Sequence, residues 1–264
     1  MIKIINNELY IKAYKKNKKI IFISQISIII LFFLIWELLA HYNLINTFIY
    51  SSPTNIFNTL INLYKQNNLF IHIYTTLYET IIAFTLGTII SFLVALLLYQ
   101  YKTLSKILDP FIIMLNSLPK IALGPLIIII AGANTKSIIV MALLINLITS
   151  LTSIYTGFIN TDKTKIKLLH TFNASKIQIL KYVVIPSAFK TIISTLKLTI
   201  SMSLIGVIMG EFLVSKRGIG YLIIYGTQVF NLSLVYTGVI LLAIISFILY
   251  KLVTYIEKKL IISN

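Results

Sequence analysis

The sequence of 264 residues contains no cysteine, which excludes disulfide bonds and thiolate metal sites. Acidic residues are also scarce: seven Asp and Glu stand against 23 Lys and Arg, giving a net charge of +16. Charged residues make up 11% of the chain, less than half of the roughly 25% that soluble domains carry. This composition excludes a disordered chain and most soluble enzymes. Lysines placed among long apolar runs also argue against a nucleic-acid binder.

Sequence signatures of catalysis are missing as well. No Gly-x-x-x-x-Gly-Lys-[Ser/Thr] stretch is present, so the chain cannot bind ATP through a P-loop. The histidines His41, His72 and His170 are scattered and lack the spacing of metal ligands. The sequence contains neither a Gly-x-Ser-x-Gly motif nor paired intramembrane aspartates, which would indicate a hydrolase or a lipid transferase. We expect no catalytic residue, no metal site and no cofactor on this chain.

Long apolar runs are what the sequence does contain. A membrane-spanning helix needs about 20 mainly apolar residues. Six runs meet this requirement, at 20–40, 74–99, 107–133, 137–158, 187–212 and 233–255. The sequence therefore predicts an all-α, polytopic membrane protein with six transmembrane helices.

Positive residues predict the topology, because cytoplasmic loops collect Lys and Arg near the ends of spans. Sixteen of the 23 positive residues precede the first span or follow the second, fourth and sixth, whereas four lie on the opposite side. We expect a multi-pass protein of the cell membrane with both termini cytoplasmic and the first span acting as a signal anchor. The expected segments are a basic tail at 1–19, the first transmembrane helix at 20–40, an outer loop at 41–73, a core of five spans at 74–255 and a cytoplasmic tail at 256–264.

The outer loop carries a helix-start signal. Ser52 can cap a helix whose first position is Pro53, and apolar residues follow at helical spacing opposite a polar face. This pattern predicts a short helix on the outer membrane surface, with a plain loop as the alternative.

The third span is interrupted in its middle by Asn116, Pro119 and Lys120, followed by Gly124 and Pro125. Proline removes a backbone donor and kinks a helix. Within a membrane, such a break is tolerated where protein or a water-filled cavity satisfies the freed groups. We therefore expect this span to line the interior of the bundle; a kink with a packing role is the alternative.

The inner loop at 160–185 predicts two short helices. Asp162 and Ser175 can cap their starts, and Asn173 lies between them, where a left-handed residue is needed. One apolar patch is formed by Leu168, Leu169 and Phe172 and a second by Ile177 and Leu180; Pro186 then begins the fifth span. An apolar surface on a basic loop indicates a docking partner.

This loop resembles the cytoplasmic coupling loop of ABC importer permeases, whose pattern is Glu-Ala-Ala, three residues, Gly, nine residues, Ile-x-Leu-Pro. Asn173 occupies the glycine position, Val183 the isoleucine, and Ile185-Pro186 the Leu-Pro pair. The triplet departs from the pattern, as it reads Lys167-Leu168-Leu169. The turn Phe172-Asn173-Ala174-Ser175 is similar to the Leu-Gly-Ala-Ser of the nitrate, sulfonate and taurine branch.

Further matches run along the chain in the family's order. They are Trp36-Glu37-Leu38-Leu39, Ser52-Pro53, Pro119-Lys120-Ile121-Ala122, Pro125-Leu126, and Glu211 followed by Gly218-Ile219-Gly220-Tyr221-Leu222-Ile223. The resemblance covers nearly everything after the basic tail. It implies the type I ABC importer permease fold.

The same resemblance implies partners and a function. A homodimer of this chain would work with separate ATP-binding subunits and an extracytoplasmic substrate-binding protein, and would import a small solute such as nitrate, a sulfonate, taurine or a vitamin precursor by alternating access. The residues implied in ATPase coupling are Leu168, Leu169, Phe172, Asn173, Ala174, Ser175, Ile185 and Pro186. The alternative from another class is an ion-coupled secondary transporter, which would be expected to show internal repeats and mid-membrane carboxylates; the sequence indicates neither.

Charges within spans are candidates for the translocation path. Glu211 lies near the outer end of the fifth span, and Lys197 approaches mid-membrane, where it could face the path, or could snorkel or pair within the bundle. Together with the break in the third span, the path candidates are Asn116, Pro119, Lys120, Lys197 and Glu211. We interpret Glu37 and Glu79 as interfacial.

Overall fold

The computed structural model describes residues 2–262, and every regular element in that range is helical. Five helices are long and apolar enough to cross a membrane, and a bent pair makes six if it counts as one span. The prediction of an all-α chain is confirmed, and its five to six candidate spans agree with the prediction of about six. The elements are α1 (Ile2–His41), α2 (Thr47–Tyr50), α3 (Pro53–Lys65), α4 (Leu69–Gln100), α5 (Lys102–Ser117), η1 (Lys120–Leu123), α6 (Gly124–Ala131), α7 (Thr135–Ile159), α8 (Lys163–Thr171), α9 (Lys176–Ile179), η2 (Leu180–Val184), α10 (Ile185–Val214), α11 (Ile219–Gln228) and α12 (Leu232–Ile262).

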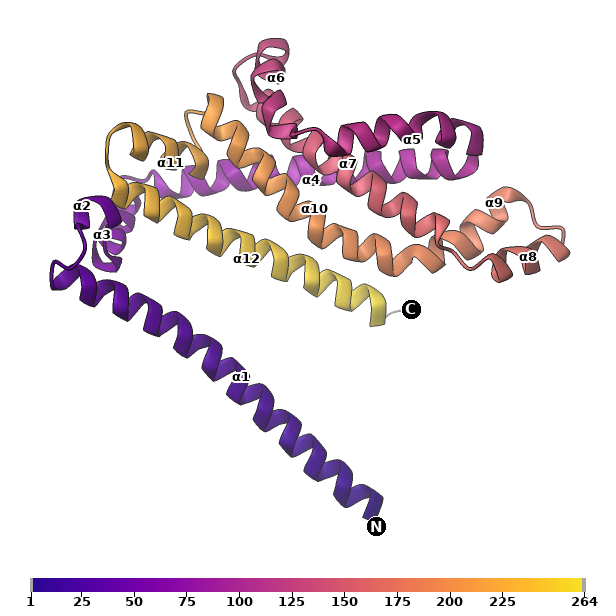
Figure 1. Ribbon diagram of the computed structural model, residues 1–264, viewed down its shortest axis with the longest axis horizontal. Coiled ribbons are helices and arrows are strands. Elements are labelled where there is room, and N and C mark those ends of the chain that lie inside the picture. Colours follow the sequence, from indigo (N-terminus) through magenta and orange to yellow (C-terminus); the bar gives the residue numbers. More distant parts are fainter. Residues whose placement is uncertain (1, 263–264) are drawn as a thin grey trace.

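The long helices pack around α10, which contacts α4, α7, α11 and α12 (Figure 1). Lipid-facing helices gain nothing from burying apolar surface against each other, so small residues and polar contacts hold them together. A Cβ added to Gly206 on α10 would lie 2.5 Å from the Cα of Ala142 on α7, so the two helices approach closely there. Asn146 of α7 donates hydrogen bonds of 3.3 and 3.2 Å to the carbonyl oxygens of Ala83 and Phe84 on α4.

The two ends of the bundle differ in character (Figure 1). The α8 end carries α8, α9, the α4–α5 turn and, closest to them, the end of α12, which come from lysine-rich parts of the sequence; the start of α1 lies apart from the bundle. The α11 end carries α2, α3 and α11. Apart from the start of α1, the segments that the positive charges assigned to one side of the membrane therefore lie toward one end of the bundle.

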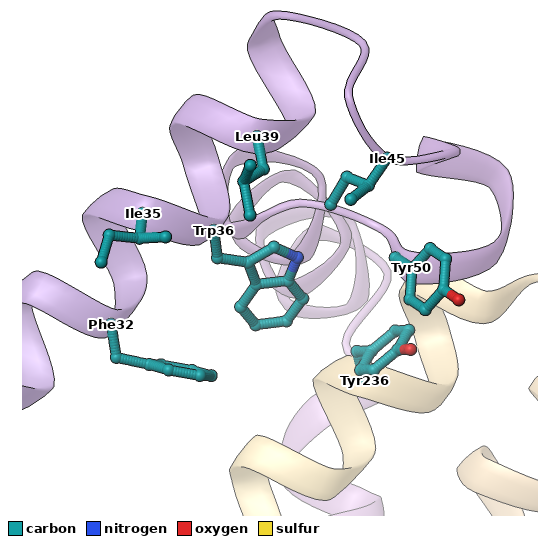
Figure 2. A pocket seen from close by; sticks show the side chains of 7 residues that line it. All are labelled: Phe32, Ile35, Trp36, Leu39, Ile45, Tyr50 and Tyr236. Carbon is teal, nitrogen blue, oxygen red and sulfur yellow. The ribbon is translucent and has the colours of Figure 1, made fainter.

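Helix α1 diverges from the bundle and contacts it through α3, near its own C-terminal end (Figure 1). The helix begins at Ile2, so the basic segment expected as a tail continues the first span as helix. Next to its contact with α12, where the rings of Trp36 and Tyr236 meet edge to face at 5.6 Å, lies an apolar hollow of about 370 Å³ (Figure 2). Its lining residues are Phe32, Ile35, Trp36, Leu39, Ile45, Tyr50 and Tyr236.

Helix α3 starts where the sequence predicted. Ser52 Oγ accepts a hydrogen bond of 3.1 Å from the Asn55 N–H, and Pro53 is the first residue of the helix. The Glu37 carboxylate at the end of α1 adds a second cap, because it accepts bonds from the Thr54 N–H (3.0 Å) and hydroxyl (2.6 Å). These contacts fix α3 against α1.

Candidate functional site

The segment from α8 to α9 is held by side-chain caps at the predicted positions. Asp162 Oδ1 accepts a hydrogen bond of 2.8 Å from the Thr164 N–H, and this bond holds the pKa of the Asp162 carboxyl below its usual value. Ser175 and Gln178 form a reciprocal capping box at the start of α9. Between the helices, Asn173 has φ of +55°, the left-handed conformation predicted for it. The turn is therefore fixed locally by its own side chains.

The apolar residues of this segment divide into two sets. Leu168, Phe172 and Ile177 are 58%, 71% and 68% exposed, respectively. In contrast, Leu169 and Ala174 pack against a buried cluster. The predicted grouping of Leu169 with the exposed patch is therefore wrong, as is the grouping of Leu180 with Ile177, because Leu180 is 6% exposed and belongs to the cluster. We call Leu168, Phe172 and Ile177 the exposed apolar triad.

The second short helix continues into the fifth span, where the sequence predicted a new start at Pro186. Helix α9, the π-helical turn η2 and α10 form one run of 39 residues, Lys176–Val214. Proline has no N–H to donate to the carbonyl four residues earlier, and the wider π turn at Leu180–Val184 accommodates this loss without ending the helix. Pro186 is exposed, whereas Ile185 packs against the buried cluster.

The break in the third span is sharper than a kink. The axes of Lys102–Ser117 and Lys120–Ala131 differ by 90°. Lys120 Nζ donates a hydrogen bond of 3.3 Å to Asn116 Oδ1, and Asn116 Nδ2 lies 3.5 Å from Thr152 Oγ1 on α7. The break is at Pro119, which joins α5 to η1.

The sequence led us to expect that the third span lines the interior of the bundle. Helix α5, its first half, does not line the interior of a single chain. None of its residues is buried, because α5 packs on α4 and α7 along one side and is otherwise uncovered. Lysine is costly in contact with lipid. Asn116 on α5 and the Lys120 ammonium that it accepts from η1 are therefore suited to a partner or an aqueous path.

Lys197 pairs within the bundle, which is one of the roles that the sequence left open. Its Nζ lies 2.5 Å from Glu257 Oε2, with the two side chains 25% and 14% exposed. The pair joins the middle of the run Lys176–Val214 to the last turns of α12.

Glu211 is the centre of a buried polar network at the α11 end. Its carboxylate accepts hydrogen bonds from the Thr76 hydroxyl (2.7 Å) and the Gly220 N–H (2.5 Å), and it is 0% exposed. Thr76 Oγ1 in turn accepts the Ile219 N–H (2.8 Å), and His72 Nδ1 accepts the Gly218 N–H (3.0 Å). The network ties α4 and α10 to the loop that leads into α11.

Sequence reasoning missed the partners in this network. The interpretation of Glu79 as interfacial is wrong, because it is 0% exposed on α4 and faces the Glu211 carboxyl. His72 and Thr76 precede it at helical spacing, so all three share one face of α4. That spacing could have shown that these polar residues share one face of α4, but not that α10 packs against that face. Lys216 and Arg217, by contrast, are exposed in the loop that follows α10.

The exposed apolar triad is suited to docking a partner, and the continuous helix behind it is suited to transmitting a displacement along the bundle. Among the described residues, no three His, Cys, Asp or Glu side chains gather into a group that could hold a metal ion. One end presents an exposed apolar triad on capped helices, continuous with a helix that reaches the polar network at the other end.

Comparison with known proteins supports this interpretation. Residues 87–262 match the family described as "Binding-protein-dependent transport system inner membrane component". A "Probable ABC transporter permease protein" of Haemophilus influenzae is 28% identical over 243 residues, covering 92% of this chain and 98% of the relative. The "Putative aliphatic sulfonates transport permease protein SsuC" of Bacillus subtilis is 23% identical, covering 86% and 82%, which supports placement in the nitrate, sulfonate and taurine branch.

The fold also has a solved counterpart. A chain of the MetNI methionine ABC transporter in an inward-facing conformation superimposes with a TM-score of 0.62 at 18% identity, covering 72% of this chain and 96% of that chain. The architecture is that of a type I ABC importer permease. With the family match spanning two thirds of its length, the chain belongs to the inner membrane components of binding-protein-dependent transport systems, the ABC transporter permeases.

Proposed function

We propose that this chain is the membrane subunit of an ATP-driven importer and that it works as a homodimer with two separate ATPase subunits and an extracytoplasmic binding protein. The α8 end and both termini then face the cytoplasm. The observation that carries this proposal is the exposed apolar triad of Leu168, Phe172 and Ile177 on a capped, basic loop. Exposed apolar surface next to the membrane, on a scaffold fixed by its own caps, fits a protein groove.

The continuity of α9 with α10 supplies a coupling route. The run Lys176–Val214 has 39 residues, a length of about 58 Å at 1.5 Å per residue. A displacement of the ATPase surface at α8 and α9 would therefore move α10 as a whole, including its far end at Glu211. Alternating access then requires no covalent chemistry on this chain.

The proposed cargo is a small solute. The relative named for aliphatic sulfonates favours a small anion of that class, and the Lys120–Asn116 pair on the uncovered face of the third span offers a positive and hydrogen-bonding surface. A vitamin precursor is the alternative cargo.

The test of coupling is co-purification with the ATPase subunit. Phe172→Asp places a charge in the exposed apolar triad, and we expect it to abolish association with the ATPase. Phe230→Asp is a matched control, because Phe230 is 72% exposed against 71% for Phe172 but lies in the turn between α11 and α12. Unchanged co-purification of the Phe172→Asp variant, or equal loss in both variants, would contradict the proposal.

The second candidate is an ion-coupled secondary transporter, which the buried Glu79–Glu211 pair favours, since such proteins use intramembrane carboxylates. Uptake by the isolated chain that follows an ion gradient without ATP would establish it. Uptake that requires ATP and the ATPase would exclude it.

A further inference from the structure

Two carboxyl groups face each other inside the bundle without a counter-charge. Glu79 on α4 and Glu211 on α10 are both 0% exposed and lie within hydrogen-bonding reach of each other. Neither oxygen of Glu79 accepts a hydrogen bond from any donor in the described part of the chain. The Thr135 hydroxyl at the start of α7 is near, but it is not in hydrogen-bonding geometry.

None of the charged and titratable groups on the surrounding elements forms an ion pair with Glu79 or Glu211. They are His72 on α4, Lys136 on α7, Lys216 and Arg217 in the loop after α10, and Tyr221 on α11. His72 accepts the Gly218 N–H through Nδ1, so its imidazole is neutral. Among the side chains that the structure describes, the one ion pair is Lys197–Glu257, which involves neither Glu79 nor Glu211. Two adjacent carboxylates buried without a cation would cost many kcal/mol, so a proton must be present.

We propose that Glu79 and Glu211 form a proton-binding site, in which Glu79 holds the proton and donates a hydrogen bond to the Glu211 carboxylate. The contacts assign the two roles. Glu211 already accepts the Thr76 hydroxyl and the Gly220 N–H, and both bonds stabilise its charged form. Glu79 accepts nothing, so the neutral acid belongs there. A protonated Glu79 also supplies the donor that this acceptor pair lacks.

The bound proton joins α4 to α10 through the Glu79–Glu211 bond. The Glu211 carboxylate also accepts the Thr76 hydroxyl and the Gly220 N–H, and Thr76 accepts the Ile219 N–H, so the proton site is continuous with the contacts at the start of α11. Loss of the proton places two negative charges side by side and separates these elements. Stability that depends on the site is therefore present at low pH and is lost as the pH rises and the proton leaves.

The test uses the full chain in lipid nanodiscs and the variant Glu79→Gln, whose carboxamide donates to Glu211 without a titratable proton. Infrared difference spectra should show the C=O stretch of a buried protonated carboxylic acid in the wild-type chain, absent from Glu79→Gln and retained in Glu37→Gln. From neutral to alkaline pH, we expect the apparent Tm of the wild type to fall by roughly 5 °C relative to Glu79→Gln.

Two results would overturn the proposal: a wild-type spectrum without a protonated carboxyl band, or a band that Glu79→Gln leaves unchanged. If Glu79→Gln does not fold, the carboxyl band of the Thr76→Val variant is compared with that of the wild type instead. This variant removes one stabilising bond from Glu211, and it should shift the wild-type band while retaining it; an unshifted band contradicts the assignment. Neither measurement involves ATP or a partner, so its outcome is independent of the proposed transport function.

Discussion

The loop that leads into α11 offers a quantitative test of the Glu211 network, through Gly218→Ala. Gly218 has φ of +103° and ψ of 166°, a conformation that is essentially restricted to glycine. A Cβ there would lie 2.2 to 2.6 Å from three carboxyl atoms of Glu211. The carboxylate must therefore move away from its donors.

Gly132→Ala is the matched control. Gly132, at the end of α6, has φ of +83° and ψ of 162°, so both substitutions carry a similar backbone cost of about 1–3 kcal/mol. The Cβ at Gly132 meets only the far end of the Asn134 side chain, at 3.0 Å. The difference between the variants therefore isolates the contact with Glu211.

The expected difference follows from the hydrogen bonds that are lost. Displacing the Glu211 carboxylate breaks its bonds with the Gly220 N–H and the Thr76 hydroxyl, each worth about 1.5–3 kcal/mol to a charged group. Gly218→Ala should cost at least about 2 kcal/mol more than Gly132→Ala, which lowers the Tm by roughly 5 °C more in a protein of this size. The assay is the fraction that survives heating in nanodiscs, measured by gel filtration. Equal Tm values for the two variants would refute the role given to Glu211.

Two further predictions concern the coupling segment and the ion pair. Asn173→Gly should leave association with the ATPase unchanged. Asn173→Val should weaken that association about tenfold, because a β-branched residue at φ of +55° costs about 1–2 kcal/mol. Pull-down titration measures the affinity of both variants, and equal affinities would mean that the turn conformation is unimportant. A double-mutant cycle of Lys197→Met and Glu257→Gln should give a coupling free energy of about 1 kcal/mol from the stability of the four proteins, because the pair is partly exposed; a value of zero would show that the contact does not contribute.

The sequence predicted the features that depend on local chemistry. The apolar runs set the spans, and Ser52, Asp162 and Ser175 cap helices because a side-chain oxygen near free N–H groups needs no tertiary partner. The left-handed conformation of Asn173 follows from the same local reasoning.

Features that depend on which helix faces which were not predictable from one sequence. Glu79 appeared interfacial because its distance along the chain places it near the end of a span, yet the packing of α10 against α4 buries it. The continuity of α9 with α10 was missed for a different reason. Pro186 is a valid start for a helix, but a π turn in front of it preserves the helix that the proline would otherwise end.

The central claim is that the exposed apolar triad docks on an ATPase, and cross-linking at a single cysteine tests it most directly. The chain contains no cysteine, so Phe172→Cys and Phe230→Cys each introduce one unique thiol, in residues of equal exposure at opposite ends of the bundle. With a short thiol–amine cross-linker in intact membranes, Phe172→Cys should be joined to a subunit whose peptides contain a P-loop, and Phe230→Cys should not. A P-loop subunit joined to Phe230→Cys instead, or to neither variant, would contradict the account.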